Sequence, residues 1–202
     1  MSAKLTRADL YTLEKYAEIR DSFRTNVMAH KKNRRVELGE HVVLLFEDRL
    51  IMQYQIQEML KAEKIFEPAG IQEELDAYNP LIPDGTNWKV TMMIQYPDVT
   101  ERQQMLGKLV DIENGVWVQV EGHDRVYPIA DEDLERSSRD KTASVHFLRF
   151  ELSPQMIGAM HEGAKLAAGV EHAHYHAVVD PVPENVRLSL AADLDPEAGR
   201  LQ

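Results

Sequence analysis

Apolar residues recur at helical spacing through the first third of the chain. Over residues 8–32 they return every third or fourth position, which predicts one long helix. A second stripe over residues 41–66 also has gaps of three and four, and it predicts a central helix that faces a core. The short segment 36–38 between them is expected to be extended. A proline and a glycine follow the central helix, and a short helix is expected over residues 71–77.

The period changes after a loop rich in proline, asparagine and glycine. Strict alternation over residues 88–96 predicts a strand with one buried face. Residues 116–120 and 125–129 flank a turn and are expected to form a hairpin. Further strands are predicted over residues 143–152 and 170–179.

Four helices are expected between and after these strands. They are predicted over residues 100–112, 131–139, 154–167 and 183–194, the third with Ser153 as its N-cap and proline at its first position. Irregular alternation of strands and helices favours a mixed or mainly antiparallel sheet. We therefore predict a single α+β domain, in which a helical part (residues 1–85) packs on a sheet-containing part (residues 86–202).

Composition narrows the class of protein. The chain has 202 residues and no cysteine, which excludes disulfides, cysteine-ligated zinc and ordinary iron–sulfur ligation within it. A net charge of −11 argues against nucleic-acid binding. No apolar run reaches the ~20 residues of a membrane span, and the first residues lack the apolar core of a signal peptide. The cytoplasm is the expected location, without a membrane partner.

A basic island lies on this acidic chain. Residues 20–35 carry six cations and one acid, Asp21. The cations either complement a solvated helix end or form a docking patch for an anionic partner or phosphate. They are Arg20, Arg24, Lys31, Lys32, Arg34 and Arg35.

The predicted central helix carries many polar residues close to a core. They are Glu47, Arg49, Gln53, Gln57, Glu58 and Glu63. Glu47 and Glu58 would share a face but lie ~16 Å apart along the axis, too far to hold one metal ion. The polar side forms either a structural network with the loop that contains Tyr78 and Asn79, or a surface for a ligand or partner.

Histidines near the C-terminus suggest a metal site. If residues 170–179 form one strand, His172, His174 and His176 point to one face, and two of them could hold zinc, iron or copper. A carboxylate or His146 would complete the site; the alternative is an exposed polar face. His146 itself alternates with buried positions, so it is either a satisfied core histidine or a ligand. Arg149 points the other way and needs an acid, with Glu121 or Glu151 as candidates.

Familiar catalytic motifs are absent from the sequence. It contains no P-loop, no Gly-x-Gly-x-x-Gly, no Gly-x-Ser-x-Gly, no His-Glu-x-x-His and no EF-hand loop.

Several strings resemble one family over nearly the whole chain. FEDRLIMQYQIQEMLKAEKI followed by EELDAYNPLIP, together with EIRDSFR, KKNRRVELG and VHFLRFEL, is similar to the bacterial domain of unknown function 3501 family. The resemblance implies no established activity. It implies an association with rubrerythrin-like and iron–sulfur oxidoreductase proteins in redox or peroxide handling. Where the family pattern has His-Pro-x-Tyr, this chain has Ala173 in place of proline, which leaves His172 and Tyr175 as the better candidates there.

Three functions remain open. The first is an accessory or binding module beside such a redox system. The second is a metal-dependent enzyme that uses His172, His146 and a carboxylate such as Glu58 with zinc or iron. The third is a sensor of a carboxylate or phosphate near Arg49, Arg149 and Gln57. The candidate ligand or partner surface comprises Arg20, Arg24, Arg34, Arg35, Glu47, Arg49, Gln53, Gln57, Glu58, Tyr78, Asn79, Arg149 and Tyr175, and the candidate metal ligands are His146, His172 and His174.

Overall fold

Two antiparallel sheets and a group of helices form the part of the chain that the computed structural model describes, residues 4–198. The larger sheet has the order β1-β2-β3-β6-β5 and the smaller has the order β4-β7-β8. The strands are β1 (Arg35–Leu38), β2 (Val42–Phe46), β3 (Asn87–Ile94), β4 (Val116–Val120), β5 (Ile129–Ala130), β6 (Val145–Glu151), β7 (Leu166–His172) and β8 (Tyr175–Val179).

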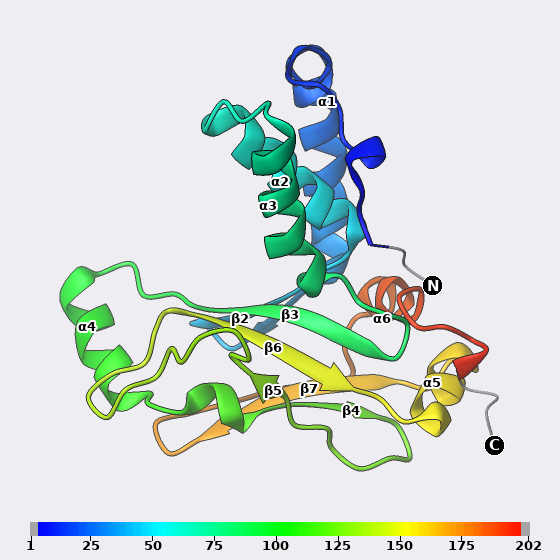
Figure 1. The fold of residues 1–202 in the computed structure, drawn as a ribbon. Helices are drawn as coiled ribbons and strands as arrows, with labels where there is room; N and C mark the ends of the chain where they lie inside the picture. The colour runs from blue at the N-terminus through cyan, green and yellow to red at the C-terminus, as the bar shows by residue number, and fades with distance from the viewer. Residues whose placement is uncertain (1–3, 199–202) are drawn as a thin grey trace.

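Helices surround the sheets on several sides. They are α1 (Leu13–Lys31), α2 (Arg49–Ala62), α3 (Pro68–Tyr78), α4 (Val99–Lys108), α5 (Pro154–His161) and α6 (Glu184–Ala191). Short 3-10 turns are η1 (Arg7–Asp9), η2 (Lys32–Arg34), η3 (Asn79–Leu81) and η4 (Ile112–Gly115). Figure 1 shows α1, α2 and α3 standing together on one side of the sheets, with α4 at the opposite end from α5 and α6. The predicted α+β class is confirmed.

The main core lies between the two sheets. Alternation along β3 buries Trp88, Val90 and Met92, and these residues share one apolar cluster with Val118 of β4 and Leu166 of β7. A second cluster lies among the helices, where α2 buries one face against α3 and the N-terminal segment. Its fully or nearly buried members include Ile51, Met52, Ile56, Leu60, Leu75 and Leu5.

The single central helix predicted over residues 41–66 is wrong. Its first part is β2, which pairs with β1 and β3, and α2 begins only at Arg49. Asp48 caps α2 by accepting a hydrogen bond of 2.9 Å from the backbone N–H of Ile51. A fully buried strand reads as a continuous apolar run, so spacing alone does not distinguish it from a helix. The predicted helical part, residues 1–85, thus also supplies two strands.

The C-terminal half needs further corrections. Residues 131–139 form an irregular loop and not a helix. Val126 does bridge to Val118, but β5 then pairs with β6 of the other sheet, so the predicted hairpin is not completed. The predicted strand over residues 170–179 is two strands, β7 and β8, joined by a turn at Ala173 and His174. No helix within the described residues is long and apolar enough to cross a membrane.

Candidate metal centre

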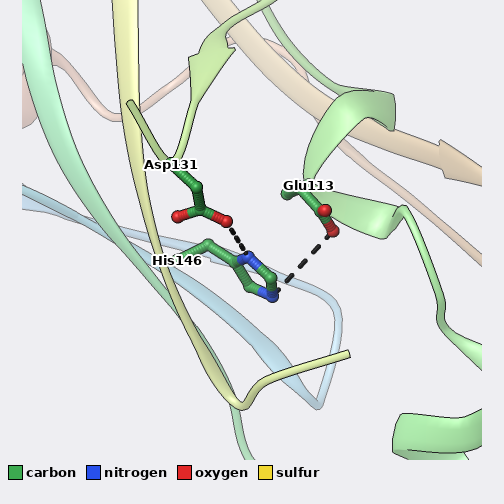
Figure 2. A group of neighbouring side chains, drawn as sticks. All are labelled: Glu113, Asp131 and His146. Carbon is green, nitrogen blue, oxygen red and sulfur yellow. Dashed lines mark hydrogen bonds and ion pairs between the residues drawn. The ribbon is translucent and has the colours of Figure 1, made fainter. Parts of the chain in front are cut away.

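His146 is fixed inside the molecule by the alternation of β6. It occupies the inward face of the strand with Leu148 and Phe150, and its side chain is 0% exposed. The turn η4 brings Glu113 to the same place, and the end of β5 brings Asp131, as Figure 2 shows. Two carboxylates from segments far apart in the sequence therefore flank one buried imidazole.

The three side chains lie close enough to hold a metal ion together. His146 Nδ1 lies 2.7 Å from Asp131 Oδ2, and His146 Nε2 lies 3.9 Å from Glu113 Oε2 (Figure 2). One ligand atom from each residue can be chosen so that all three lie within 4.8 Å of one another. Glu113, Asp131 and His146 could thus hold a metal ion.

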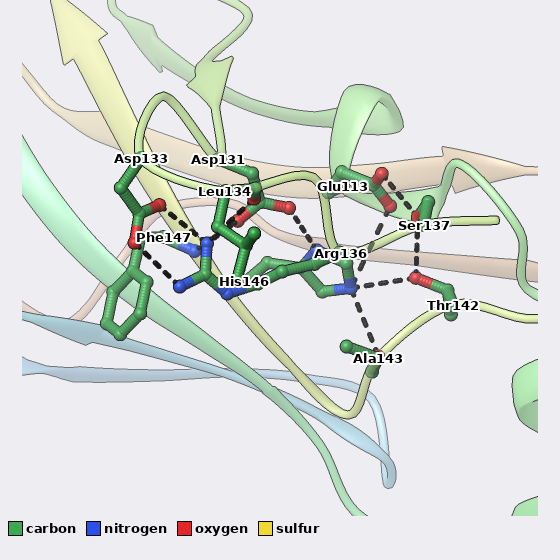
Figure 3. Close-up of polar contacts among 10 residues, drawn as sticks. All are labelled: Glu113, Asp131, Asp133, Leu134, Arg136, Ser137, Thr142, Ala143, His146 and Phe147. Carbon is green, nitrogen blue, oxygen red and sulfur yellow. Dashed lines mark hydrogen bonds and ion pairs between the residues drawn. The ribbon is translucent and has the colours of Figure 1, made fainter.

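Asp131 is itself held in place by three donors. Its Oδ1 accepts hydrogen bonds from the backbone N–H of Phe147 at 2.9 Å and from Arg136 at 3.3 Å (Figure 3). Arg136 also binds Asp133 at 2.6 Å, and its guanidinium lies 4.6 Å from the centre of the Phe147 ring. With its other oxygen facing Nδ1 of the imidazole, Asp131 orients the ring in the way that a carboxylate orients a metal-binding histidine.

Oxygen atoms surround the other ring nitrogen. His146 Nε2 lies 2.8 Å from Thr142 Oγ1 and 3.0 Å from the carbonyl oxygen of Ala143. Ser137 donates to Glu113 Oε1 at 2.7 Å and lies 2.8 Å from Thr142 Oγ1 (Figure 3).

The hydroxyl groups near His146 Nε2 supply one proton fewer than the short contacts there require. In the tautomer whose Nδ1–H donates to Asp131, Nε2 carries no proton. Three short contacts then link Glu113, Ser137, Thr142 and His146 Nε2 in a row. The hydroxyl groups of Ser137 and Thr142 supply only two protons for these three contacts. A proton on Nε2, or a metal ion bound to it, would supply the missing partner. Moreover, Glu113 Oε2 is buried with no hydrogen-bond partner among the described residues.

His172 and His174 lie apart from this centre. His174 sits in the turn between β7 and β8, so the predicted row of three histidines on one strand face is wrong. His172 Nε2 donates to the carbonyl of Val110 at 3.0 Å, and its Nδ1 accepts from the backbone N–H of His174 at 3.2 Å. The only predicted metal residue found in the cluster around His146 is His146 itself.

Glu58 is committed to a structural pair and does not join His146. It accepts hydrogen bonds from Tyr16 at 2.7 Å and from two nitrogens of Arg20 at 2.8 and 2.7 Å. The bonds from Arg20 lower the pKa of Glu58 to about 2. The predicted combination of His172, His146 and Glu58 is therefore not assembled.

The other polar residues of α2 hold the N-terminal segment. Gln53 donates to the carbonyl of Asp9 at 2.6 Å, and Gln57 accepts from the backbone N–H of Tyr11 at 2.6 Å. Arg49 pairs with Asp9 at 2.6 Å. Asn79, outside α2, holds Leu5: it accepts a hydrogen bond from the Leu5 N–H at 2.7 Å and donates to the Leu5 carbonyl at 2.9 Å. The polar side chains of α2 thus bond to the N-terminal segment and not to the loop of Tyr78 and Asn79, which bonds to the same segment through Asn79.

Several predicted surface residues are buried. Arg34 is 1% exposed, Glu47 2% and Gln57 0%, so none of them forms a surface. Arg34 binds Asp193 and the backbone carbonyls of Phe46 and Glu47, and it therefore joins η2 to β2 and to the end of α6. Of the basic island, Arg24, Lys32 and Arg35 are exposed.

Arg149 and Tyr175 have defined partners. Arg149 binds Glu132 through two bonds of 2.7 Å and also binds Glu151, so one of the two acids predicted for it is present and Glu121 is not. The hydroxyl of Tyr175 donates to the carbonyl of Leu38 at 2.6 Å and thereby ties the edge of one sheet to the other.

Glu113 and Asp131 are not among the site residues predicted from the sequence. Asp131 stands at the start of the helix predicted over residues 131–139, which does not form, and Glu113 follows the helix predicted over residues 100–112 without belonging to a motif. The available signal was His146 itself, because a buried histidine on an inward strand position requires polar partners from other segments.

One solved structure is similar to the whole fold. It is a crystal structure described as a novel protein of unknown function from Burkholderia pseudomallei K96243, with 50% sequence identity and a TM-score of 0.90. The match covers 96% of this chain and 100% of that one. No curated protein matches the chain. A family model described as a protein of unknown function (DUF3501) matches residues 4–194, and the chain therefore belongs to the DUF3501 family.

Proposed function

We propose that this protein binds a divalent metal ion between His146 and Glu113, with Asp131 orienting the imidazole. The observation that carries the proposal is Glu113 Oε2, which is buried without a partner 3.9 Å from His146 Nε2. A buried carboxylate oxygen without a hydrogen bond is costly, and a cation removes that cost.

A metal ion fits the cluster better than a proton does. A proton on Nε2, or one shared between Glu113 and Ser137, completes the short hydrogen bonds but leaves Glu113 Oε2 without a partner. A metal ion accepts the lone pair of Nε2 and binds Oε2 at the same time. Thr142 Oγ1 and the carbonyl of Ala143, at 2.8 and 3.0 Å from Nε2, are further oxygen donors.

The distances require only a small adjustment. Two bonds of about 2.1 Å at a tetrahedral angle place their ligand atoms roughly 3.4 Å apart. Nε2 and Oε2 would therefore approach by about half an ångström. Thr142 Oγ1 and the carbonyl oxygen of Ala143 would move away from Nε2 by about as much to become ligands. One imidazole nitrogen with carboxylate, hydroxyl and carbonyl oxygens is a donor set suited to Zn²⁺ or Fe²⁺.

The ion would have a structural role and would stabilise the fold. His146 and Glu113 are 0% and 5% exposed, so a substrate has no open route to the ion. The ion would instead join η4, the loop over residues 131–142 and β6, and its binding free energy would add to the stability of the folded state.

Metal analysis of protein prepared without a His-tag tests the proposal. We expect close to one zinc or iron per chain by mass spectrometry of the digested protein, and an apo protein whose melting temperature rises when Zn²⁺ or Fe²⁺ is added. At 100 times its dissociation constant, the ion adds ~2.7 kcal/mol of stability. Glu113→Gln should abolish the shift, whereas Glu135→Gln, an exposed glutamate in the neighbouring loop, should not change it.

Two results would contradict a metal site. One is less than about one metal in ten chains together with no shift in melting temperature for any divalent ion, since a buried site that contributes to folding should hold its ion during purification. The other is an equal shift in the Glu113 variant and in wild type, which would place the ion elsewhere.

An accessory role beside rubrerythrin-like and iron–sulfur proteins remains a prediction of the family resemblance. Among the cations of the basic island, the exposed Arg24, Lys32 and Arg35 are those that a partner would contact. Affinity capture with co-encoded proteins is the test. If charge-reversing variants of both arginines capture the same proteins as wild type, this surface is not the contact.

A further inference from the structure

A second site lies on the opposite face of β6, away from His146. A cavity of about 560 Å³ opens between the end of α3 with η3 and the outer faces of β3 and β6. Its volume lies within the range of sites that bind small molecules. Tyr78 and Leu81 line one wall, and Lys89, Phe147 and Arg149 line the other.

Almost every charge at this cavity already has a partner. Glu132 is paired with Arg149 at 2.7 Å, and Asp133 with Arg136 at 2.6 Å. Lys89 differs, because among residues 4–198 its ammonium makes no hydrogen bond or ion pair. Lys89 is therefore the cation of the lining that has no bonded partner, whereas the exposed Asp76 accepts a hydrogen bond from the neutral Gln72.

Lys89 is also partly withdrawn from water. Burial, followed by the nearby Arg149, lowers the pKa of its ammonium from the ordinary value. The nearby carboxylates of Glu132, Asp84 and Glu151 oppose this shift, but none of them bonds to the ammonium. An anionic ligand would give this half-buried cation a direct partner.

The rest of the cavity is apolar with one more free polar group. The Tyr78 hydroxyl has no hydrogen-bond partner among the described residues, and a phenol can donate to a carboxylate. Leu81 and the ring of Phe147 supply apolar surface. One free cation, one free hydroxyl donor and an apolar wall match a small molecule with one carboxylate and a hydrocarbon body.

We propose that this cavity binds a small organic monocarboxylate, whose carboxylate contacts Lys89 and Tyr78 and whose apolar part packs against Leu81 and Phe147. A phosphate fits less well, because a dianion would face one free cation and the nearby carboxylates of Glu132 and Asp133. The site does not depend on the metal centre, which lies on the inner face of β6.

Calorimetric titration of the full chain with acetate, hexanoate, benzoate, benzamide and inorganic phosphate tests the proposal. We expect hexanoate or benzoate to bind more tightly than acetate, and benzamide and phosphate to bind more weakly than either. Lys89→Met keeps the aliphatic stem, and it should weaken carboxylate binding about tenfold, as expected for the loss of a partly desolvated ion pair. Tyr78→Phe should weaken it several-fold.

The variants are matched for folding and for charge. Lys89 has no partner to lose, so Lys89→Met should melt close to wild type, and Lys108→Met removes an exposed cation in α4 as the control. The proposal is overturned if no carboxylate binds at about 10 mM, the weak limit of a specific site. It is equally overturned if Lys89→Met binds carboxylates like wild type, or if benzamide or phosphate binds best. None of these results would affect the metal measurements.

Discussion

Glu47 is a buried carboxylate whose charge should destabilise the fold at neutral and alkaline pH. Its side chain is 2% exposed, Thr91 donates to Oε1 at 2.5 Å, and Oε2 has no partner among the described residues. Burial raises the pKa of Glu47 from 4.5 to about 7. Replacing Glu47 with glutamine removes the ionisation and keeps the size of the side chain.

The sign of the effect follows from the two pKa values. Between pH 4.5 and pH 7 the unfolded chain loses the proton while the folded chain keeps it, so stability falls as pH rises through this window. Below the window both states are protonated, and above it both are ionised. A shift of about 2.5 pKa units corresponds to about 3 kcal/mol lost across the window.

The assay is denaturant unfolding of wild type and Glu47→Gln from pH 4.5 to pH 8.5. Between pH 5 and pH 8, the free energy of unfolding of wild type should fall by about 2–3 kcal/mol more than that of the variant. The NH2 group of glutamine would lie without a partner at the position of Oε2, but that cost is constant and does not alter the change with pH. Asp193, whose pKa burial raises to about 6, contributes to both proteins and cancels in the comparison.

Parallel pH profiles for wild type and Glu47→Gln would refute this reasoning. They would mean that water or structural relaxation solvates the carboxylate in the folded state. Glu37→Gln is the control, because Glu37 is exposed and no pH-dependent difference is expected from it.

Two substitutions test the packing of the backbone. Gly115→Ala places a Cβ 2.2 Å from the carbonyl oxygen of Glu171, and it should lower the free energy of unfolding by about 3 kcal/mol or more in denaturant unfolding. Gly107→Ala in α4 is the control, because its nearest contact is at 3.4 Å and it should be neutral or slightly stabilising. Equal effects of the two substitutions would refute the clash. Asn79→Ala removes both hydrogen bonds to Leu5 and should lower the free energy of unfolding by about 1–3 kcal/mol. The backbone amide of Leu5 should also exchange its hydrogen faster. Unchanged exchange would show that the Asn79 side chain does not hold this segment.

The helices of the first third illustrate how far periodicity reaches. The helix predicted over residues 41–66 is correct only for the part that forms α2, where a half-buried helix exposes polar residues at regular intervals. The preceding run of β2 is buried on both faces, between the sheets and under the helices, so no polar residue breaks its pattern. Its strand character depends on pairing with β1 and β3, which are separate segments of the chain.

The candidate sites divide in the same way. His146 was identified as inward-facing because alternation along one strand fixes which face a residue occupies. Its partners were not identifiable, since Glu113 and Asp131 reach it only when η4 and β5 fold against β6. Lys89 and Tyr78 likewise come from a strand and a helix that meet only in the tertiary structure.

The sequence by itself determined the fold class, most helices, the strands β3, β4 and β6, the family and the absence of cysteine chemistry. These properties depend on composition and on local periodicity, which a single chain carries in its order of residues. The tertiary structure alone decided which polar residues are buried, which carboxylate meets which cation, and where a charge is left without a partner. Such pairings join residues far apart in the sequence, and their energies depend on burial and on distances of a few ångströms, neither of which local spacing encodes.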